Sequence, residues 1–386
     1  MPVEESTHRR LTLLADGDEL ATALLESGIE RTPDGPDFAR LRFRDSGGCS
    51  MLDGQGLCRV HAGFGHAELF AVCATYPRYA NEIDDDVELF GTLACPEVTR
   101  LALLAADGFE LALSTVEATP RLARNRFRTA SPYFMPFKQL RSAFIQLLSE
   151  PAYALAEKLF VMLWLADKLK PVLYEGCASV PPLDLEKALS ALADPGVLGA
   201  LSSSFRGLML EGTLPISVIV ATLRPPGEPR PGAQTTRFEG IWHEVEARYG
   251  AAVARGHAPS DAELRDVWTS YRATCARLPA SARERIDVCL TRYGVNHLLT
   301  TPHMLSANLF QYAYDLVLRL ACLRFLLNSR LADFCGSQRE LDASIVEVVY
   351  SFVRTIENAD LPSELRKTLR EQGLDGFAHA VCFLSI

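Results

Sequence analysis

The stretch LSANLFQYAYDLVLRLACLRFLL, from Leu305 to Leu327, decides the fold class. Its apolar residues recur at intervals of three and four, the spacing of one helix face. The residues at this spacing are Leu305, Leu309, Tyr312, Leu316, Leu320, Leu323 and Leu327. Arg319 and Arg324 interrupt its most apolar part, which is too short and too charged to span a bilayer. We therefore expect one long helix of a soluble protein with no membrane partner.

Helical spacing continues on both sides of this stretch. Residues 151–170 carry one apolar face, formed by Leu155, Leu159, Met162, Leu163 and Leu169. Further helices are expected at 183–193, 197–211, 239–255, 261–277, 281–299, 341–357, 362–372 and 374–384. Residues 224–235 contain four prolines and two glycines, which predicts a loop.

The first 105 residues differ from this helical pattern. The segment 47–97 is rich in glycine and carries Pro77 and Pro96, so loops and short elements are expected there. Leu41–Arg44 and Val87–Leu93 are predicted strands. The predicted fold class is mainly α. A small cysteine-rich, loop-rich N-terminal module with short strands (1–105) packs on a large helical body (106–386) that carries the Pro-rich loop at 224–235.

Composition limits the partners and the compartment. A net charge of −9 over 386 residues argues against a nucleic-acid partner, because domains that bind phosphate backbones usually carry a basic surface. The N-terminus has early acids and no apolar segment of signal-peptide length, so we expect a cytoplasmic protein. Thiols stay reduced in the cytoplasm. A cysteine cluster there favours a metal or redox site over a disulfide framework.

Four of the ten cysteines, Cys49, Cys58, Cys73 and Cys95, fall between Gly47 and Glu97. Their spacings, C-x8-C, C-x14-C and C-x21-C, lack the tight C-x2-C of zinc knuckles. Four thiolates suit zinc or an iron–sulfur cluster, since both accept sulfur ligands in a tetrahedral arrangement. Buried apolar cysteines are also common in protein cores. Spacing alone leaves a metal site and a core role open.

The residues between the cysteines resemble the flagellin lysine-N-methylase family. Four linked elements carry the resemblance, in the family's order and at similar separations: Cys49-Ser50-Met51-Leu52, Leu57-Cys58-Arg59-Val60, Cys73-Ala74-Thr75-Tyr76-Pro77-Arg78 and Leu93-Ala94-Cys95-Pro96-Glu97-Val98-Thr99-Arg100-Leu101. A broader group of zinc- or iron-chelating domains shares the earlier part, and the last element favours the methylase family. Beyond about residue 105 the resemblance lies only in the helical pattern.

The resemblance implies a cytoplasmic enzyme that transfers methyl groups from S-adenosylmethionine to lysine side chains of a protein. It implies a four-iron–four-sulfur cluster on the family's cysteines, here Cys49, Cys58, Cys73 and Cys95, with zinc as the alternative metal. It also implies a protein substrate with exposed lysines, either flagellin or another surface protein. Family members usually carry further cysteines upstream, and this chain has none before Cys49. We therefore expect either that the given start lies too far downstream or that this member has lost part of the site.

Three residues near the cysteines are predicted to act in catalysis. Glu97 could take the proton that a lysine must lose before its nitrogen attacks a methyl sulfonium. Arg78 could hydrogen-bond cluster sulfur or a substrate carboxylate, and Tyr76 lies beside it in the Tyr-Pro-Arg element. Structural roles remain open for these residues. Glu97 would favour a helix start, and Arg78 could pair with neighbouring acids.

Two other functions stay open. The chain could be a non-catalytic zinc- or iron-binding protein, or an inactive paralogue that kept the fold. No Gly-rich strand–loop–helix segment of the Rossmann methyltransferase type can be picked out. The sequence therefore does not place the methyl-donor site, and we expect that site to be built in another way.

Overall fold

A computed structural model describes residues 2–32, 38–44, 48–105, 112, 124–179, 182–225, 233–359 and 361–386. The chain divides by packing into two compact units. The N-terminal unit comprises Met1–Thr92, Ala112–Arg126 and Glu228–Arg237. The helical unit comprises Leu93–Leu111, Phe127–Gly227 and Phe238–Ile386. The division predicted at residue 105 follows the change from a loop-rich to a helical residue pattern. That boundary stays a prediction.

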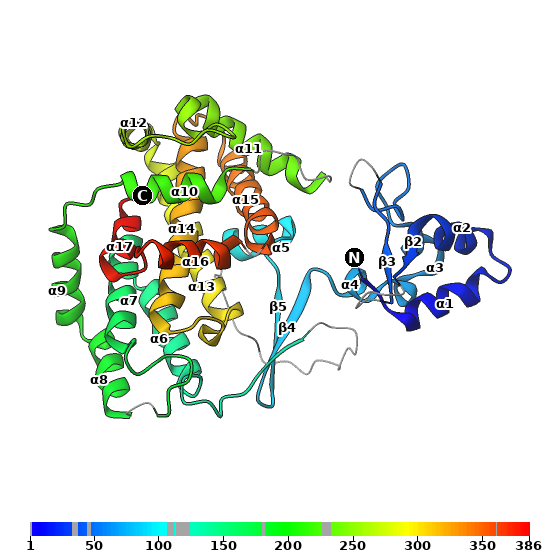
Figure 1. The fold of residues 1–386 in the computed structure, drawn as a ribbon, viewed down its shortest axis with the longest axis horizontal. Coiled ribbons are helices and arrows are strands. Elements are labelled where there is room, and N and C mark those ends of the chain that lie inside the picture. Colours follow the sequence, from blue (N-terminus) through cyan, green and yellow to red (C-terminus); the bar gives the residue numbers. More distant parts are fainter. Residues whose placement is uncertain are drawn as a thin grey trace. The chain divides into compact units, whose positions relative to one another are not determined.

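The N-terminal unit begins with two helices packed on a small sheet (Figure 1). Helices α1 (Glu5–Ala15) and α2 (Glu19–Gly28) are followed by β2 (Ile29–Arg31) and β3 (Ala39–Leu41). The sheet order is β1-β3-β2, with β1 (Pro2–Val3) and β2 both antiparallel to β3. The apolar sides of these elements form a core that includes Val3, Leu11, Leu24 and Leu41.

Short elements carry the chain through the cysteine region: α3 (Arg59–Phe64), η1 (His66–Glu68), α4 (Ala71–Thr75), β4 (Arg78–Ile83) and β5 (Asp86–Gly91). Strands β4 and β5 form an antiparallel hairpin, and β6 (Arg124–Phe127) joins β4 on the other side. Strand β5 covers most of the predicted strand Val87–Leu93. The predicted strand Leu41–Arg44 is wrong in its bounds, because β3 ends at Leu41 and Phe43 forms only an isolated bridge with Cys49.

The helical unit confirms the mainly α fold class. Its helices are α5 (Pro96–Leu104), α6 (Phe137–Ser149), α7 (Leu155–Leu169), α8 (Pro182–Ala193), α9 (Pro195–Arg206), α10 (Thr213–Leu223), most of α11 (Ala233–Tyr249), α12 (Asp261–Arg277), α13 (Ala280–Thr300), α14 (Leu309–Leu331), α15 (Gln338–Thr355), α16 (Leu361–Glu371) and α17 (Phe377–Cys382). The single-turn helices η2 (Gly250–Val253), η3 (His303–Leu305), η4 (Glu357–Ala359) and η5 (Phe383–Ser385) connect or follow them.

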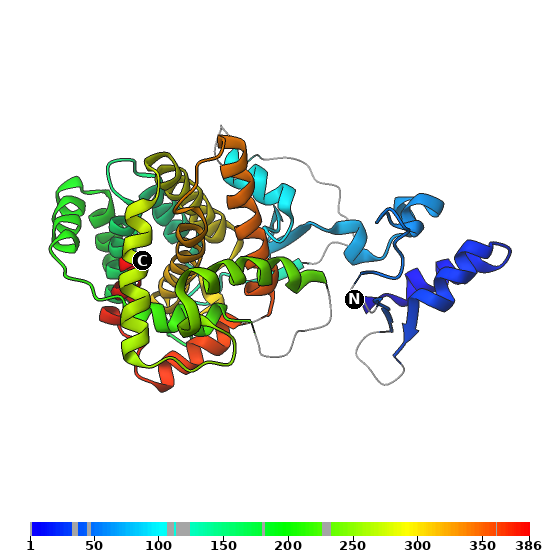
Figure 2. The same ribbon diagram turned by 90° about the horizontal axis from the view of Figure 1, so that it is seen from above.

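Helix α14 is the centre of the helical unit. It packs against α7, α10, α12, α13 and α15, and both views show it running through the middle of this unit (Figures 1 and 2). Most of its side chains are buried, which suits a helix with neighbours all round. It begins after Asn308, whose side-chain oxygen accepts from the backbone N–H of Gln311 at 2.9 Å. The predicted start at Leu305 is therefore wrong, and Leu305 lies 59% exposed in η3.

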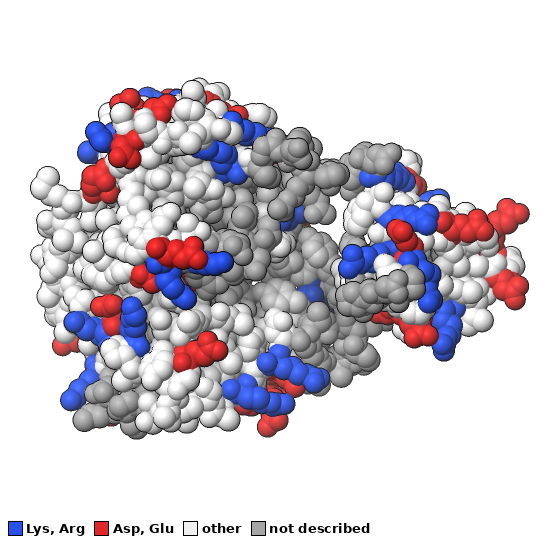
Figure 3. All heavy atoms as spheres, in the orientation of Figure 1, with Lys and Arg blue, Asp and Glu red and all other residues white. Residues whose placement is uncertain are grey.

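Two other expectations meet limits in the structure. Residues 226–232 of the predicted loop 224–235 lie outside the described residues, and α11 already begins at Ala233. Among the described residues, every helix is too short or too polar to cross a membrane. On the face shown in Figure 3, basic and acidic side chains of the helical unit are interspersed, with uncharged surface between them.

Candidate functional site

Three of the predicted metal ligands gather on the core of the N-terminal unit. Cys49 forms an isolated bridge with Phe43, Cys58 precedes α3, and Cys73 lies inside α4. All three are partly buried and pack against the same apolar cluster, which contains Met51, Val60 and Phe70. The elements that carry these thiols therefore share one core, although 24 positions separate Cys49 from Cys73 in sequence (73 − 49).

The titration of Cys73 reflects this arrangement. Burial raises the pKa of the Cys73 thiol to about 11, and the neighbouring thiols of Cys49 and Cys58 add to the rise. A bound cation would act in the opposite sense, because it stabilises thiolates. All ten cysteines are free of disulfides.

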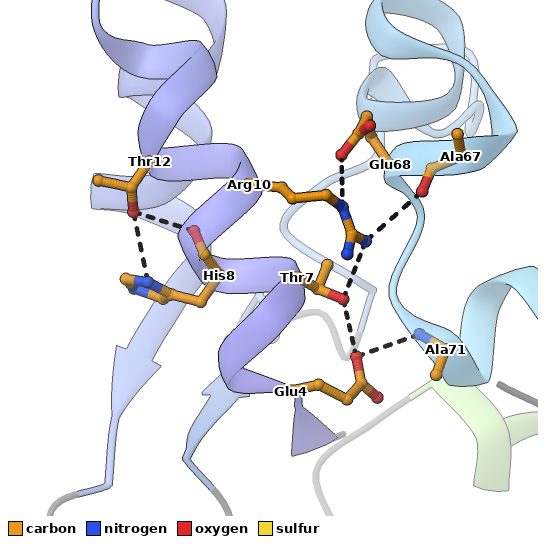
Figure 4. Close-up of polar contacts among 8 residues, drawn as sticks. All are labelled: Glu4, Thr7, His8, Arg10, Thr12, Ala67, Glu68 and Ala71. Carbon is orange, nitrogen blue, oxygen red and sulfur yellow. Dashed lines mark hydrogen bonds and ion pairs between the residues drawn. The ribbon is translucent and has the colours of Figure 1, made fainter. Parts of the chain in front are cut away.

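Polar contacts from α1 fix the position of α4, as Figure 4 shows. A carboxylate oxygen of Glu4 accepts from the Thr7 hydroxyl at 3.1 Å and from the backbone N–H of Ala71, the first residue of α4, at 3.3 Å. Arg10 donates through Nε to Glu68 at 3.0 Å. Contacts from Glu4 and Arg10 thus hold Ala71 and Glu68 in place. Cys73 lies two residues beyond Ala71, within α4.

The fourth predicted ligand, Cys95, belongs to the helical unit. It is the N-cap of α5, and Pro96 occupies the first helical turn, where its missing N–H costs nothing. Glu97 and Arg100 share one helix face, and the guanidinium donates two hydrogen bonds of 2.8 and 2.7 Å to the carboxylate. Hydrogen bonding to Arg100 lowers the pKa of Glu97, and both side chains are exposed.

Tyr76 and Arg78 lie at the junction of α4 and β4. Tyr76 follows α4, is 48% exposed, and precedes Pro77 through a cis peptide bond. Arg78 is exposed as the first residue of β4. Both side chains are exposed. Tyr76 and Arg78 belong to the N-terminal unit, whereas Glu97 belongs to the helical unit.

The thiols do not form a ready metal site in this arrangement. Among the described residues, no three His, Cys, Asp or Glu side chains are placed to hold one metal ion. Cys49, Cys58 and Cys73 pack against one core, and Cys95 belongs to the helical unit. A tetrahedral thiolate site needs four sulfurs around one point. The N-terminal unit by itself therefore supplies three of the four predicted thiols.

A cavity of about 720 Å³ lies in the helical unit, and sequence reasoning did not find it. The end of α6, the start of α7 and one side of α13 line this α6–α7–α13 cavity. Apolar side chains form much of its wall, among them Ile145, Leu148, Val288, Val295 and Leu299. The acids of α13 were visible in the sequence, but nothing there showed which face of α13 borders a cavity.

Charged side chains also line the α6–α7–α13 cavity. Lys158 is buried and donates from Nζ to the backbone oxygens of Leu148 at 2.7 Å and Glu150 at 3.1 Å. Burial lowers the pKa of Lys158, opposed by the charges of Glu150 and Asp287. Asp287 pairs with Arg324 at 2.6 Å. The cavity thus combines apolar walls with fixed charges of both signs, as small-molecule sites do.

The helical unit matches the family model described as the FliB lysine N-methylase C-terminal domain, over residues 141–383. The chain belongs to the FliB lysine N-methylase family. All residues that line the α6–α7–α13 cavity lie within this match, so the cavity is a feature of the family domain in this chain. The resemblance read from the cysteine elements is confirmed by an independent part of the sequence.

Curated proteins similar to this chain include a flagellar biosynthetic protein and two lysine-N-methylases. The chain is 31% identical over 91 residues to the flagellar biosynthetic protein FliU of Salmonella muenchen, which covers 24% of this chain and 54% of that protein. It is 26% identical over 178 residues to the lysine-N-methylases of Salmonella typhimurium and Salmonella choleraesuis, covering 45% of this chain and 41% of each relative. The chain therefore spans about half the length of these relatives or less. No solved structure matches it.

Proposed function

We propose that this protein transfers methyl groups from S-adenosylmethionine to lysine side chains of flagellin or another surface protein. The observation that carries the proposal is the match of residues 141–383 to the FliB lysine N-methylase domain. The relative named as a flagellar biosynthetic protein supports a flagellar substrate. Ten free cysteines are consistent with action in the reducing cytoplasm.

The transfer requires a neutral lysine. The amine attacks the methyl carbon of the sulfonium, the carbon–sulfur bond breaks, and S-adenosylhomocysteine leaves with the bonding electron pair. A base must take the ammonium proton, and we keep Glu97 as the proposed acceptor. Its hydrogen bonds to Arg100 lower its pKa and weaken it as a base, so it would act best if the substrate displaced Arg100. Exposed Tyr76 and Arg78 are proposed substrate contacts.

The proposal keeps an iron–sulfur cluster on Cys49, Cys58, Cys73 and Cys95, with zinc as the alternative. The sharing of one core by the first three thiols supports it. Because no three ligand side chains among the described residues form a coordination set, no reaction step is assigned to the metal. Metal analysis and a visible absorption band that bleaches with dithionite would distinguish a cluster from zinc.

The decisive experiment is intact-mass analysis of flagellin after incubation with the full chain and S-adenosylmethionine. Mass increments of one methyl group each, mapped to lysines, are expected. A reaction without the methyl donor is the control for pre-existing methylation. If the folded, metal-loaded chain leaves flagellin and other surface proteins unmodified, the enzyme proposal is wrong. Zinc without transfer would then favour a non-catalytic metal-binding protein, and a bound donor without transfer would favour an inactive paralogue.

A further inference from the structure

The α6–α7–α13 cavity has dimensions that suit a ligand of cofactor size. Its volume of about 720 Å³ lies inside the range of roughly 300–1,000 Å³ that is usual for small-molecule sites. It is formed by the helical unit alone and lies in the segment that matches the family domain. The ligand that fits it must offer an apolar part and several charged or polar groups.

Two carboxylates of α13 contribute negative charge to this cavity. Glu284 and Asp287 are three residues apart on one helix face and both line the space. The ion pair with Arg324 holds Asp287 in place. Glu284 is exposed and forms no hydrogen bond or ion pair with the described residues, so its carboxylate is available to a ligand donor. Carboxylates accept hydrogen bonds from ammonium groups and from paired hydroxyls.

Cations and apolar side chains complete the lining. Arg283 and Lys158 provide positive charge, and Lys158 also joins the end of α6 to the start of α7 through the Leu148 and Glu150 oxygens. These bonds fix the wall opposite α13. Val288 and Val295 stand on α13 together with the acids. An aromatic ring system could therefore pack beside the same helix face that presents the carboxylates.

We propose that the α6–α7–α13 cavity binds S-adenosylmethionine, with its carboxylates on the ribose hydroxyls and ammonium group, its cations on the ligand carboxylate, and its apolar wall on the adenine. This inference rests on the proposed function, because that function requires this donor. It deepens the function by assigning the donor to the helical unit and not to the cysteine core of the N-terminal unit.

Calorimetric titration of the full chain with S-adenosylhomocysteine tests the site without any methyl transfer. The wild-type chain is expected to bind. Glu284→Gln is expected to weaken binding by about tenfold, the usual size of one lost charge-assisted hydrogen bond. Val288→Trp is expected to abolish binding, because the indole fills the cavity from α13.

Matched controls separate the cavity from general effects of substitution. Glu371→Gln removes an exposed carboxylate at the end of α16, and Leu208→Trp adds the same indole at an exposed position after α9. Neither residue lines the cavity. Both control variants are expected to bind S-adenosylhomocysteine like the wild type, and melting curves check that all four variants are folded.

The result that overturns the inference is unchanged binding in both Glu284→Gln and Val288→Trp, since the donor would then lie elsewhere. A wild-type chain that methylates lysine without binding S-adenosylhomocysteine at this cavity also overturns it, while leaving the proposed function intact. Conversely, cavity-dependent binding without lysine methylation keeps the site and removes the proposed function.

Discussion

The Cys73 thiol is partly buried against the core of the N-terminal unit, against which Cys49 and Cys58 also pack. Its pKa of about 11 predicts slow alkylation at pH 8, because the thiolate is the reactive form. Timed iodoacetamide labelling with peptide mass spectrometry of the metal-free chain is expected to modify the exposed Cys335 well before Cys73. The Cys73 rate should then rise steeply as the pH approaches 11.

Glu4 offers a way to test the origin of that pKa. Its charge contributes to the rise, so Glu4→Gln is expected to speed Cys73 labelling. Glu5→Gln, one position along and paired with Arg9, is the matched control and should leave the rate unchanged. Labelling of Cys73 at the rate of Cys335 in the wild-type chain would contradict the buried position.

His303 is a buried histidine clamped to Tyr133 in the helical unit. Its Nε2 donates to the Tyr133 backbone oxygen at 2.8 Å, and the Tyr133 hydroxyl donates to the His303 backbone oxygen at 2.9 Å. Burial lowers the pKa of His303 to about 4. Between pH 6.5 and 4, His303 is protonated in the unfolded chain and neutral in the folded chain. The free energy of unfolding is therefore unaffected by His303 above pH 6.5 and falls as the pH drops from 6.5 to 4.

The measurable consequence is a pH-dependent melting temperature. His303 alone should contribute a slope of up to about 1.4 kcal/mol per pH unit between pH 6.5 and 4. His303→Asn keeps a donor and does not titrate, so its melting temperature should fall less on acidification. His297, whose pKa burial also lowers, should retain part of the slope. Equal slopes in wild type and His303→Asn would show that His303 is not buried as a neutral group.

At the scale of elements, Asn308 sets where the central helix begins. Its side chain satisfies the N–H of Gln311, and Asn308→Ala is expected to cost about 1 kcal/mol of unfolding free energy. For a unit of this size that corresponds to a fall of about 2–4 °C in melting temperature. Asn308→Asp retains a cap acceptor and should melt near the wild type. Equal melting temperatures for Asn308→Ala and Asn308→Asp would show that the capping hydrogen bond does not contribute to stability.

Helix periodicity made most of this fold predictable, because burial on one face leaves a spacing of three and four in the sequence. The α13 prediction of 281–299 differs from the observed Ala280–Thr300 by one residue at each end. Helix ends depend on single capping contacts. The spacing of apolar residues predicts Leu305 as the start of α14, whereas the Asn308 cap places the start at Leu309. The cysteine elements also identified the family, since four spaced motifs rarely coincide.

The cavity was not predictable for a physical reason. Glu284 and Asp287 have the same spacing as any solvated acidic pair on a helix face. Only the packing of α13 beside the junction of α6 and α7 turns that face into the wall of a cavity. The assignment of Cys95 to the helical unit was not predictable for the same reason, because a unit boundary is set by long-range contacts and not by local sequence.

At the scale of the whole molecule, the two units carry different natural probes. All three tryptophans, Trp164, Trp242 and Trp268, lie in the helical unit, while Cys49, Cys58 and Cys73 lie in the N-terminal unit. Tryptophan fluorescence therefore follows unfolding of the helical unit, and thiol labelling follows opening of the N-terminal unit. Two compact units need not unfold in one step, so the two probes can give separate transitions.

These probes make the placement of the methyl donor testable by heat. A ligand stabilises the unit that binds it by about 2.7 kcal/mol at a free concentration of 100 times its dissociation constant. S-adenosylhomocysteine is therefore expected to raise the fluorescence-detected melting temperature by roughly 5–10 °C and to leave the labelling of Cys49, Cys58 and Cys73 unchanged. Val288→Trp should lose the shift and Leu208→Trp should keep it. A ligand that protected the three thiols while the fluorescence transition stayed fixed would place the donor on the N-terminal unit instead.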